Sequence, residues 1–431
     1  MRIFKTVICC ILVLFALGIL TFAGFFLFRS IQSPEQELPT VLHTEEIFAE
    51  EEMLILPEEE SEEEPVEEPL PEEDPEEEEI PEESPAQIAA RAYLENMTAE
   101  EKIFQLMMVR PEDITMVETA TRAGDTTKEA LEKFPVGGIC YFADNLEDQE
   151  QAADMLSKTQ SYAKTPLFMA VDEEGGRVSR AGSNEELAVT HLPAAAQFGA
   201  DGDITALYRA GTTLAKELKT LGFNLNFAPV ADIATDPDNA EIGDRAYSSD
   251  PETAAVMVST MVDALQKNGM ASCLKHFPGH GSAQGDTHEG TAVSTRTLEE
   301  LQENEWLPFR AGIGQGVKFV MVSHLTNENL SAQPASLSPE VMNFLRQELG
   351  FEGVIITDSL QMKAIIGHYG ANKAAVLALQ AGADMLLMPN SVEKAYNGIT
   401  AALESGELTQ ERIDESVLRI LTVKYEMGIM K

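Results

Sequence analysis

The chain has 431 residues, 44% of them hydrophobic, which is enough to build a large buried core. Its formal net charge of −43 has the wrong sign for a nucleic-acid-binding protein, which needs positive charge to neutralise phosphates. The 4 cysteines are too few to indicate a disulfide framework in a chain of this length.

An apolar segment at residues 6–28 follows two basic residues, Arg2 and Lys5. Its length suits a helix that crosses the hydrocarbon layer of a bilayer. The positive-inside rule keeps residues 1–5 in the cytoplasm and places the chain after Arg29 outside. A cleaved signal peptide is the alternative, but the segment is long and lacks a clear cleavage site. We therefore expect an uncleaved single-pass anchor in the cell membrane, with the rest of the protein extracytoplasmic.

Residues 29–85 form a Pro/Glu-rich spacer. Between Glu35 and Glu83 there are twenty-four acidic residues and neither lysine nor arginine. A segment of this composition cannot bury enough apolar surface to offset the entropy lost on ordering. We expect it to be a disordered, solvated linker without a specific partner.

Residues 86–431 alternate between short apolar runs and helix-period segments. The apolar runs predict eight buried strands at 104–109, 137–142, 167–171, 223–230, 270–274, 317–323, 353–357 and 384–388. The intervening segments predict helices, among them 204–221, 252–268, 339–349 and 373–381. Eight strand–helix units in this length fit an α/β fold with a single closed (β/α)8 TIM-like barrel better than an open sheet.

Polar residues follow several of the predicted strands, and the carboxyl ends of parallel strands meet at one rim of a barrel. That rim should carry the residues at 172–180, Asp232, Lys275, His276, Ser323, His324 and Asp358. By contrast, the glycine-rich segment at 312–316 resembles a dinucleotide-binding fingerprint but precedes a strand. We interpret it as the turn that ends a helix on the opposite rim.

The segment 275–288 concentrates proton-active side chains after the fifth strand, with three histidines, a lysine and an aspartate. Asp286 and His288 are two residues apart, which places both side chains on the same side of an extended chain. A contact between them would fix the histidine tautomer and leave its second nitrogen free to transfer a proton near neutral pH. Ordinary loop histidines remain an alternative, as does a metal site that uses His276, His280, Asp286 and His288.

Five motifs together resemble glycoside hydrolase family 3, in its bacterial β-N-acetylhexosaminidase branch. They are Asp-Glu-Glu-Gly-Gly-Arg-Val-Ser-Arg at 172–180, Gly-Asp-Arg-Ala-Tyr at 243–247, Lys-His-Phe-Pro-Gly-His-Gly at 275–281, Asp-Thr-His at 286–288 and Ile-Thr-Asp-Ser-Leu-Gln-Met at 356–362. The resemblance implies a TIM-like barrel and a retaining, exo-acting enzyme. Such an enzyme removes β-linked N-acetylglucosamine from non-reducing ends and requires no metal or other cofactor.

The resemblance also implies roles for individual residues. Asp358 corresponds to the nucleophile that forms a glycosyl-enzyme, and His288 to the general acid/base that Asp286 orients. Five further residues correspond to groups that hold the terminal sugar: Asp172, Arg180, Arg245, Lys275 and His276. Without the resemblance, Asp358 is equally consistent with a helix cap, and Arg245 with a loop ion pair to Asp244 or Glu241.

The sequence departs from the family pattern after His288, where it continues Glu-Gly-Thr, and in its acidic leader. With the predicted topology, we expect the substrate to be peptidoglycan or its soluble pieces outside the membrane. Three alternatives remain. A phosphorylase would require inorganic phosphate, a metal-dependent hydrolase would lose activity in chelator, and a surface sugar-binding protein would bind without turnover.

Overall fold

The computed structural model describes residues 83–285, 290 and 292–431. In this part of the chain eight parallel strands form one sheet, in which each strand pairs with the one of the eight that follows it along the sequence. The last strand pairs with the first, and a parallel bridge between Ile356 and Met385 completes the ring. The strands are β1 (Met107–Val109), β2 (Gly138–Tyr141), β3 (Phe168–Val171), β6 (Leu225–Asn226), β7 (Ala271–Phe277), β9 (Phe319–Val322), β12 (Val354–Thr357) and β13 (Leu386–Leu387). The predicted (β/α)8 barrel is therefore confirmed.

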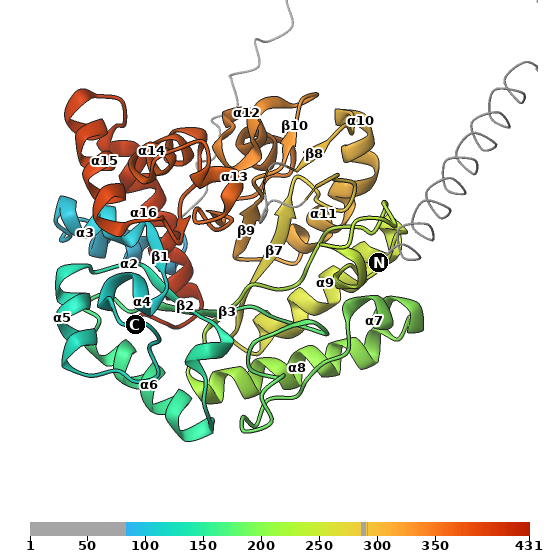
Figure 1. Cartoon of the computed structure of the whole chain (residues 1–431), viewed down its shortest axis with the longest axis horizontal. Helices are drawn as coiled ribbons and strands as arrows, with labels where there is room; N and C mark the ends of the chain where they lie inside the picture. Colours follow the sequence, from blue (N-terminus) through green and yellow to red (C-terminus); the bar gives the residue numbers. More distant parts are fainter. Residues whose placement is uncertain (1–82, 286–289, 291) are drawn as a thin grey trace, which may run out of the picture. The chain divides into compact units, whose positions relative to one another are not determined.

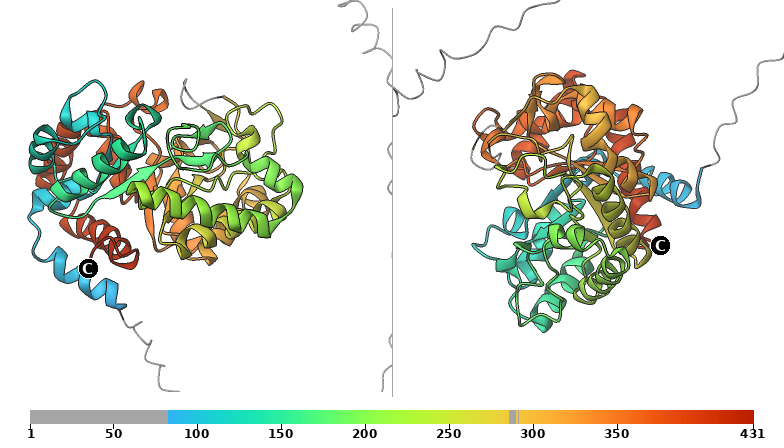
Figure 2. Two further views of the ribbon diagram at one scale, coloured as in Figure 1. Left: turned by 90° about the horizontal axis from the view of Figure 1, so that it is seen from below. Right: turned by 90° about the vertical axis from the view of Figure 1, so that its right-hand side faces the viewer.

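Helices surround the strands on all sides in the views of Figures 1 and 2. The helices of nine or more residues are α2 (Pro85–Leu94), α5 (Asp125–Lys133), α6 (Gln149–Tyr162), α8 (Ile204–Leu221), α9 (Pro251–Lys267), α11 (Trp306–Gly314), α14 (Ala371–Ala381), α15 (Val392–Ser405) and α16 (Gln410–Glu426). The shorter ones are α3 (Ala99–Gln105), α4 (Pro111–Thr115), α7 (Ala195–Asp201), α10 (Leu298–Glu300), α12 (Pro339–Asn343) and α13 (Lys363–Ile366). Figure 2 shows the first of these helices, α2, beside the last, α16.

Every predicted strand is present, but the first and the last are shorter than expected, and the fourth is shortened most. The run 223–230 contributes only the two-residue strand β6 and a separate bridge between Val230 and Lys275. Pro229 lies between these two pairings, and proline has no N–H to donate to a sheet. The polar chain that follows Val230 therefore leaves the sheet at the carboxyl rim.

The predicted helices also match, with one difference. Prediction and structure coincide at 204–221, whereas the segment 339–349 begins as α12 and continues as a π-helical turn at Phe344–Glu348. Arg346 lies in that wider turn and donates to the carbonyl oxygens of Phe351 and Gly353. The glycine-rich segment 312–316 ends α11, and Gly316 has a φ of 74°, so it is a helix-ending turn as predicted.

The predicted membrane span at 6–28 and residues 29–82 of the acidic spacer lie outside the described residues. Within the described ranges, no helix combines the length and the hydropathy needed to cross a bilayer. The first described helix, α2, begins at Pro85 with Ser84 as its N-cap. The Ser84 hydroxyl accepts from the Gln87 N–H, and the Gln87 side chain accepts from the Ser84 N–H.

A cluster of charges holds the rim opposite to the strand carboxyl ends. Asp384, just before β13, is fully buried and accepts from Arg346 Nη2 at 2.5 Å, from Arg419 Nη1 at 3.2 Å and from Ser416 Oγ at 2.8 Å. Burial alone would raise the pKa of the Asp384 carboxyl, but the nearby arginines outweigh it and lower that pKa. The cluster ties helix α16 to the barrel.

Lys424 of α16 is also buried at this end of the barrel. Its Nζ donates to Gln105 Oε1 at 2.8 Å and lies 5.0 Å from the centre of the Phe168 ring. Neither of these contacts is with a carboxylate that would offset the hydration that the ammonium group loses on burial. Burial therefore lowers the pKa of Lys424 to about 7.

We expect Lys424 to make the protein more stable as the pH rises above 7. The folded pKa of about 7 lies below the ordinary value of 10.5. Between these values the unfolded chain binds a proton that the native chain does not, so the free energy of unfolding increases with pH. The slope of the free energy of unfolding against pH approaches about 1.4 kcal/mol per pH unit.

Urea unfolding at several pH values between about 7 and 9 measures this slope, and Lys424→Met should remove the contribution of Lys424. Lys216→Met, at an exposed position on α8, is the control and should keep the slope. An unchanged slope in Lys424→Met would contradict the assignment.

Candidate active site

The polar residues predicted for one rim do lie at the carboxyl ends of the strands. Asp172 follows β3, Lys275 and His276 lie near the end of β7, and Asp358 follows β12. Asp232 follows the bridge at Val230. The regular barrel thus brings together side chains from distant parts of the sequence.

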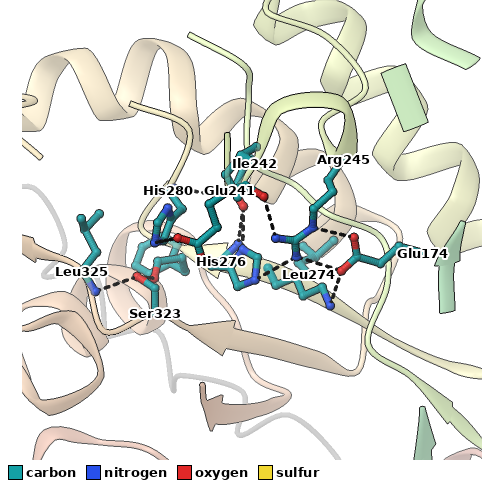
Figure 3. Close-up of polar contacts among 12 residues, drawn as sticks. Glu174, Glu241, Ile242, Arg245, Leu274, His276, His280, Ser323 and Leu325 are labelled. Carbon is teal, nitrogen blue, oxygen red and sulfur yellow. Dashed lines mark hydrogen bonds and ion pairs between the residues drawn. The ribbon is translucent and has the colours of Figure 1, made fainter. Parts of the chain in front are cut away.

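A buried network of charges joins the ends of β3 and β7. Lys275 Nζ lies 2.6 Å from Asp172 Oδ1 and 2.6 Å from Glu174 Oε1. Glu174 also binds Arg245 through two hydrogen bonds, from Nε at 2.8 Å and from Nη2 at 2.9 Å. Figure 3 shows Arg245 between Glu174 and His276, whose Nε2 lies 3.5 Å from Arg245 Nη2. Two carboxylates and two cations therefore balance each other in a largely dehydrated place.

The charges in this network keep one another ionised. Burial would raise the pKa of Glu174, but Lys275 and Arg245 outweigh it and lower that pKa to about 2. Burial would lower the pKa of Lys275, yet Asp172 and Glu174 raise it overall. A lysine ammonium has three N–H groups, and two of them are directed at carboxylates here, so one can bind a ligand hydroxyl.

Asp232 fixes the orientation of His276. Its Oδ2 lies 2.7 Å from His276 Nδ1 and accepts from the His276 backbone N–H at 3.0 Å. The other oxygen accepts from the His280 backbone N–H at 2.6 Å. Burial acts to raise the pKa of Asp232, but His276 and these hydrogen bonds lower it. Because Asp232 accepts a hydrogen bond from Nδ1–H, His276 presents Nε2 toward Arg245.

Glu173 shapes the turn that carries Arg180. Its carboxylate accepts from the backbone N–H groups of Arg180, Ala181 and Gly182, and from the Ser179 hydroxyl. These bonds close the small hairpin of β4 (Glu173–Gly175) and β5 (Val178–Ser179). The two adjacent glycines, Gly175 and Gly176, make the turn of this hairpin. Gly175 has a φ of 92°, and a Cβ there would lie 2.7 Å from the Pro193 carbonyl oxygen.

Arg180 stands apart from the charge network. Its guanidinium carbon lies 5.5 Å from the centre of the Phe142 ring. Its Nε is buried and has no hydrogen-bond partner in the described part of the chain. A buried donor of this kind is costly unless something accepts a hydrogen bond from it, so this N–H is suited to a bound ligand.

Asp358 does not cap the helix that follows it. Helix α13 begins at Lys363 with Met362 as its N-cap, whereas Asp358 Oδ1 accepts from the adjacent Ser359 N–H at 2.7 Å. His324, predicted for the same rim, lies 2.8 Å through Nε2 from the Ser359 carbonyl oxygen. The segment after Asp358 is thus fixed by contacts with the end of β9, and the helix-cap interpretation of Asp358 is wrong.

Asp358 and the charge network lie on the same rim of the barrel. Asp172 follows β3, Lys275 lies near the end of β7 and Asp358 follows β12, and the three strands belong to one parallel sheet. The residue predicted as the nucleophile is therefore at the same end of the barrel as the charge network.

Asp286 and His288, the predicted proton-transfer pair, lie outside the described residues. The two ends of their segment are paired: Gln284 and Val293 exchange backbone hydrogen bonds of 2.9 Å in each direction. Val293 belongs to β8 (Val293–Ser294), which forms a small sheet with β10 (Thr326–Asn327) and β11 (Ser331–Pro334). The segment therefore starts and ends next to the chain that follows β7 and β9.

The metal-site alternative used His276, His280, Asp286 and His288. Among the described residues, no group of three or more His, Cys, Asp or Glu side chains is arranged to hold a metal ion. His280 is almost fully buried, and its Nε2 lies 3.8 Å from Glu241 Oε2. Burial, together with the charge of His276, lowers the pKa of His280. His280 is therefore suited to remain neutral beside His276.

The sequence interpretation missed Glu174, which is central to the network. Asp172 and Glu174 are two residues apart, so the argument that paired Asp286 with His288 could have found it. The same omission affected the expectation for Arg245, which binds Glu174 as well as the Glu241 carbonyl oxygen. Asp244 binds Arg177 instead.

Comparisons with known proteins agree on one family. Residues 98–423 match the model of the glycosyl hydrolase family 3 N-terminal domain. The chain is 30% identical over 328 residues to beta-hexosaminidase A of Pseudoalteromonas piscicida, which covers 69% of this chain and 55% of the relative. A glycoside hydrolase family 3 beta-N-acetylglucosaminidase from Paenibacillus sp. str. FPU-7 has a TM-score of 0.72 and 36% identity, covering 77% of this chain and 63% of that one. A beta-glucoside phosphorylase, BglX, has a TM-score of 0.71 and 25% identity, covering 80% and 61%. The chain thus spans less than two thirds of each of these three proteins.

Removing the charge of Glu174 should destabilise the fold. Glu174→Gln leaves Lys275 and Arg245 without their shared buried carboxylate, and breaking such a pair typically costs about 3–5 kcal/mol. The free energy of unfolding from urea titration measures the loss. Asp244→Asn is the matched control, because the ion pair of Asp244 with Arg177 is about half exposed and should contribute less than about 1 kcal/mol. Equal, small losses in both variants would show that the network does not hold the rim together.

Proposed function

The chain belongs to glycosyl hydrolase family 3, and from this membership we propose that it is a retaining exo-β-N-acetylglucosaminidase. The observation that carries the proposal is the common location of two features. Asp358 follows β12, and the buried network of Asp172, Lys275, Glu174 and Arg245 joins the ends of β3 and β7 on the same rim of the barrel. A carboxylate can attack a sugar at that mouth while fixed charges hold the hydroxyls of the same ring.

The reaction proceeds in two steps. In the first, an Asp358 oxygen forms a bond to the anomeric carbon, and the bond from that carbon to the leaving oxygen breaks. His288 gives its proton to the leaving oxygen, and Asp286 stabilises the resulting change in charge. In the second step His288 takes a proton from water, whose oxygen attacks the same carbon and frees Asp358. The sugar leaves with its original anomeric configuration.

The surrounding residues position the sugar. Lys275 and Asp172 form a donor–acceptor pair suited to adjacent hydroxyl groups, and Arg180 has a buried N–H to offer. His276 is held by Asp232, so its Nε2 has a fixed direction. Holding one terminal ring in a single geometry lets binding energy lower the barrier to bond cleavage.

Substitutions at Asp358 and His288 should affect different substrates differently. Asp358→Ala should lower kcat/KM by about a thousandfold or more on any β-N-acetylglucosaminide, since no glycosyl-enzyme can form. His288→Ala should harm substrates with basic leaving groups far more than p-nitrophenyl substrates, whose leaving group needs no proton. Initial rates on a chromogenic glycoside and on a disaccharide measure both effects.

Circular dichroism confirms that each variant is folded, and His368→Ala gives a comparison at an exposed histidine without a proposed role in the reaction. Near-normal turnover by Asp358→Ala would contradict the nucleophile assignment. Equal losses on both substrates would contradict the role of His288.

Phosphorolysis is the second candidate, because BglX, which has the same fold at 25% identity, is described as a phosphorylase. A neutral or cationic acid/base repels incoming phosphate less than a carboxylate would. The chain from about Ser84 onward, incubated with a β-N-acetylglucosaminide, distinguishes the two reactions. Hydrolysis releases free N-acetylglucosamine without added phosphate, whereas phosphorolysis needs phosphate and yields the sugar phosphate.

The proposed location is the outer face of the cell membrane, where the substrate is a peptidoglycan-derived glycan. Residues 6–28 with Arg2 and Lys5 support a single-pass anchor, and the acidic spacer gives the barrel reach. Protease added to intact cells should cut the spacer and release the barrel into the medium. Detection with an antibody to the barrel measures the release, and a cytoplasmic protein serves as the control for lysis. A protected spacer would contradict this topology.

A further inference from the structure

A large cleft lies on the active-site rim, beside the ends of β1, β2 and β13. Its volume is about 1060 Å³, at the upper end of the range that holds a drug-sized ligand. A single sugar ring needs much less space. The cleft therefore has room for a molecule larger than the terminal sugar that the catalytic centre holds.

The cleft adjoins the catalytic centre on two sides. Gln361, which lines it, lies three residues after Asp358 and donates through Nε2 to Asp113 Oδ1 at 3.2 Å. Phe142 also lines it and contacts the guanidinium of Arg180. In an exo-acting enzyme, everything beyond the terminal sugar extends away from the anomeric carbon. The cleft reaches the segment that follows Asp358 and the side chain that contacts Arg180, so it is suited to that leaving group.

The surface of the cleft includes apolar side chains that a folded protein would ordinarily cover. Met116 is 85% exposed and Val117 is 41% exposed. In the described part of the chain, two non-glycine residues have positive φ, Met116 at 59° and Met388 at 45°, and both line this cleft. Unusual backbone conformations in non-glycine residues concentrate at functional sites. An apolar platform here can contact the carbon face of a ligand.

The charge of the cleft is strongly negative. Six carboxylates line it against two cations, and both cations are already paired, Arg110 with Asp113 at 2.8 Å and Lys133 with Glu393 at 2.6 Å. Three of the remaining carboxylates, on Glu118, Glu129 and Asp144, are exposed and face solvent. Together they create a negative potential that attracts a cation and repels an anion.

We propose that this cleft binds a leaving group that carries a primary ammonium, such as an N-deacetylated amino sugar or an amine-bearing peptide. The inference deepens the proposed glycosidase function and rests on it. The apolar platform contacts the carbon skeleton, while the carboxylates attract the ammonium. The enzyme then prefers glycans whose second unit is cationic over those whose second unit is acetylated.

Matched pairs of substrates test this preference. They also show whether the preferred amine belongs to an amino sugar or to a peptide. The first pair is N-acetylglucosaminyl-β-1,4-glucosamine and its fully N-acetylated counterpart. The second is a serine-linked N-acetylglucosaminyl peptide with an adjacent lysine and the same peptide with acetyl-lysine. At about pH 6 the amines are protonated, and we expect kcat/KM to be about fivefold higher for the amine in at least one pair. The pair that shows the preference identifies the source of the amine.

The triple variant Glu118→Gln, Glu129→Gln, Asp144→Asn should abolish the preference, as should high salt, because exposed charges are screened. A control triple variant, Asp201→Asn, Glu352→Gln, Glu404→Gln, removes as many exposed carboxylates outside the cleft and should keep the preference. The substrate p-nitrophenyl N-acetylglucosaminide has a small leaving group without an amine. Both triple variants should therefore hydrolyse it at the same rate as the native chain.

Equal kcat/KM within both pairs, or a preference that survives in the cleft variant, would overturn the inference while leaving the glycosidase function intact. Absence of turnover on the chromogenic substrate by the native protein would instead overturn the proposed function, and the inference with it.

Discussion

The active-site rim depends on one shared carboxylate. Glu174 neutralises Lys275 and Arg245 at the same time, at distances between 2.6 and 2.9 Å, where little water remains. Buried cations without such a partner would change protonation state or draw water into the site. Glu174 accepts hydrogen bonds from only some of the N–H groups of Lys275 and Arg245. Both side chains therefore stay charged and fixed in position, and their other N–H groups can bind a ligand. The network thus fixes the ends of β3 and β7 and prepares the site in advance of binding.

The two ends of the barrel use buried charge for different purposes. At the opposite rim, Asp384 is surrounded by arginines and has a hydrogen-bond partner for each oxygen, so its contacts stabilise the fold. Around the barrel mouth, Arg180 Nε and the ring of His280 are buried without hydrogen-bond partners in the described residues. Unsatisfied groups are tolerated where a ligand can satisfy them, which is the usual division between the two faces of a (β/α)8 barrel.

The chain combines a barrel that is shared across its family with a cleft formed by loops of the rim. The family 3 match covers residues 98–423, which include the charge network at the ends of β3 and β7. The platform at Met116 and Val117 belongs to the segment after β1, which is a loop and a short helix of the rim. Loops of this kind vary without disturbing the barrel, so selectivity for the rest of the substrate can change while the catalytic centre stays the same.

The sequence by itself determined the eight strands, the long helices α8, α9 and α14, and the rim on which Asp172, Lys275, His276 and Asp358 lie. These features follow from hydrophobic periodicity and from the order of strand and polar residue, which are local properties. Only the tertiary structure decided which charges pair. Glu174 and Arg245 are 71 residues apart, and no local pattern distinguishes that pairing from one with Asp244. The cleft beside β1 and β13 also arises from the packing of distant segments, because a cavity exists only once the barrel has closed.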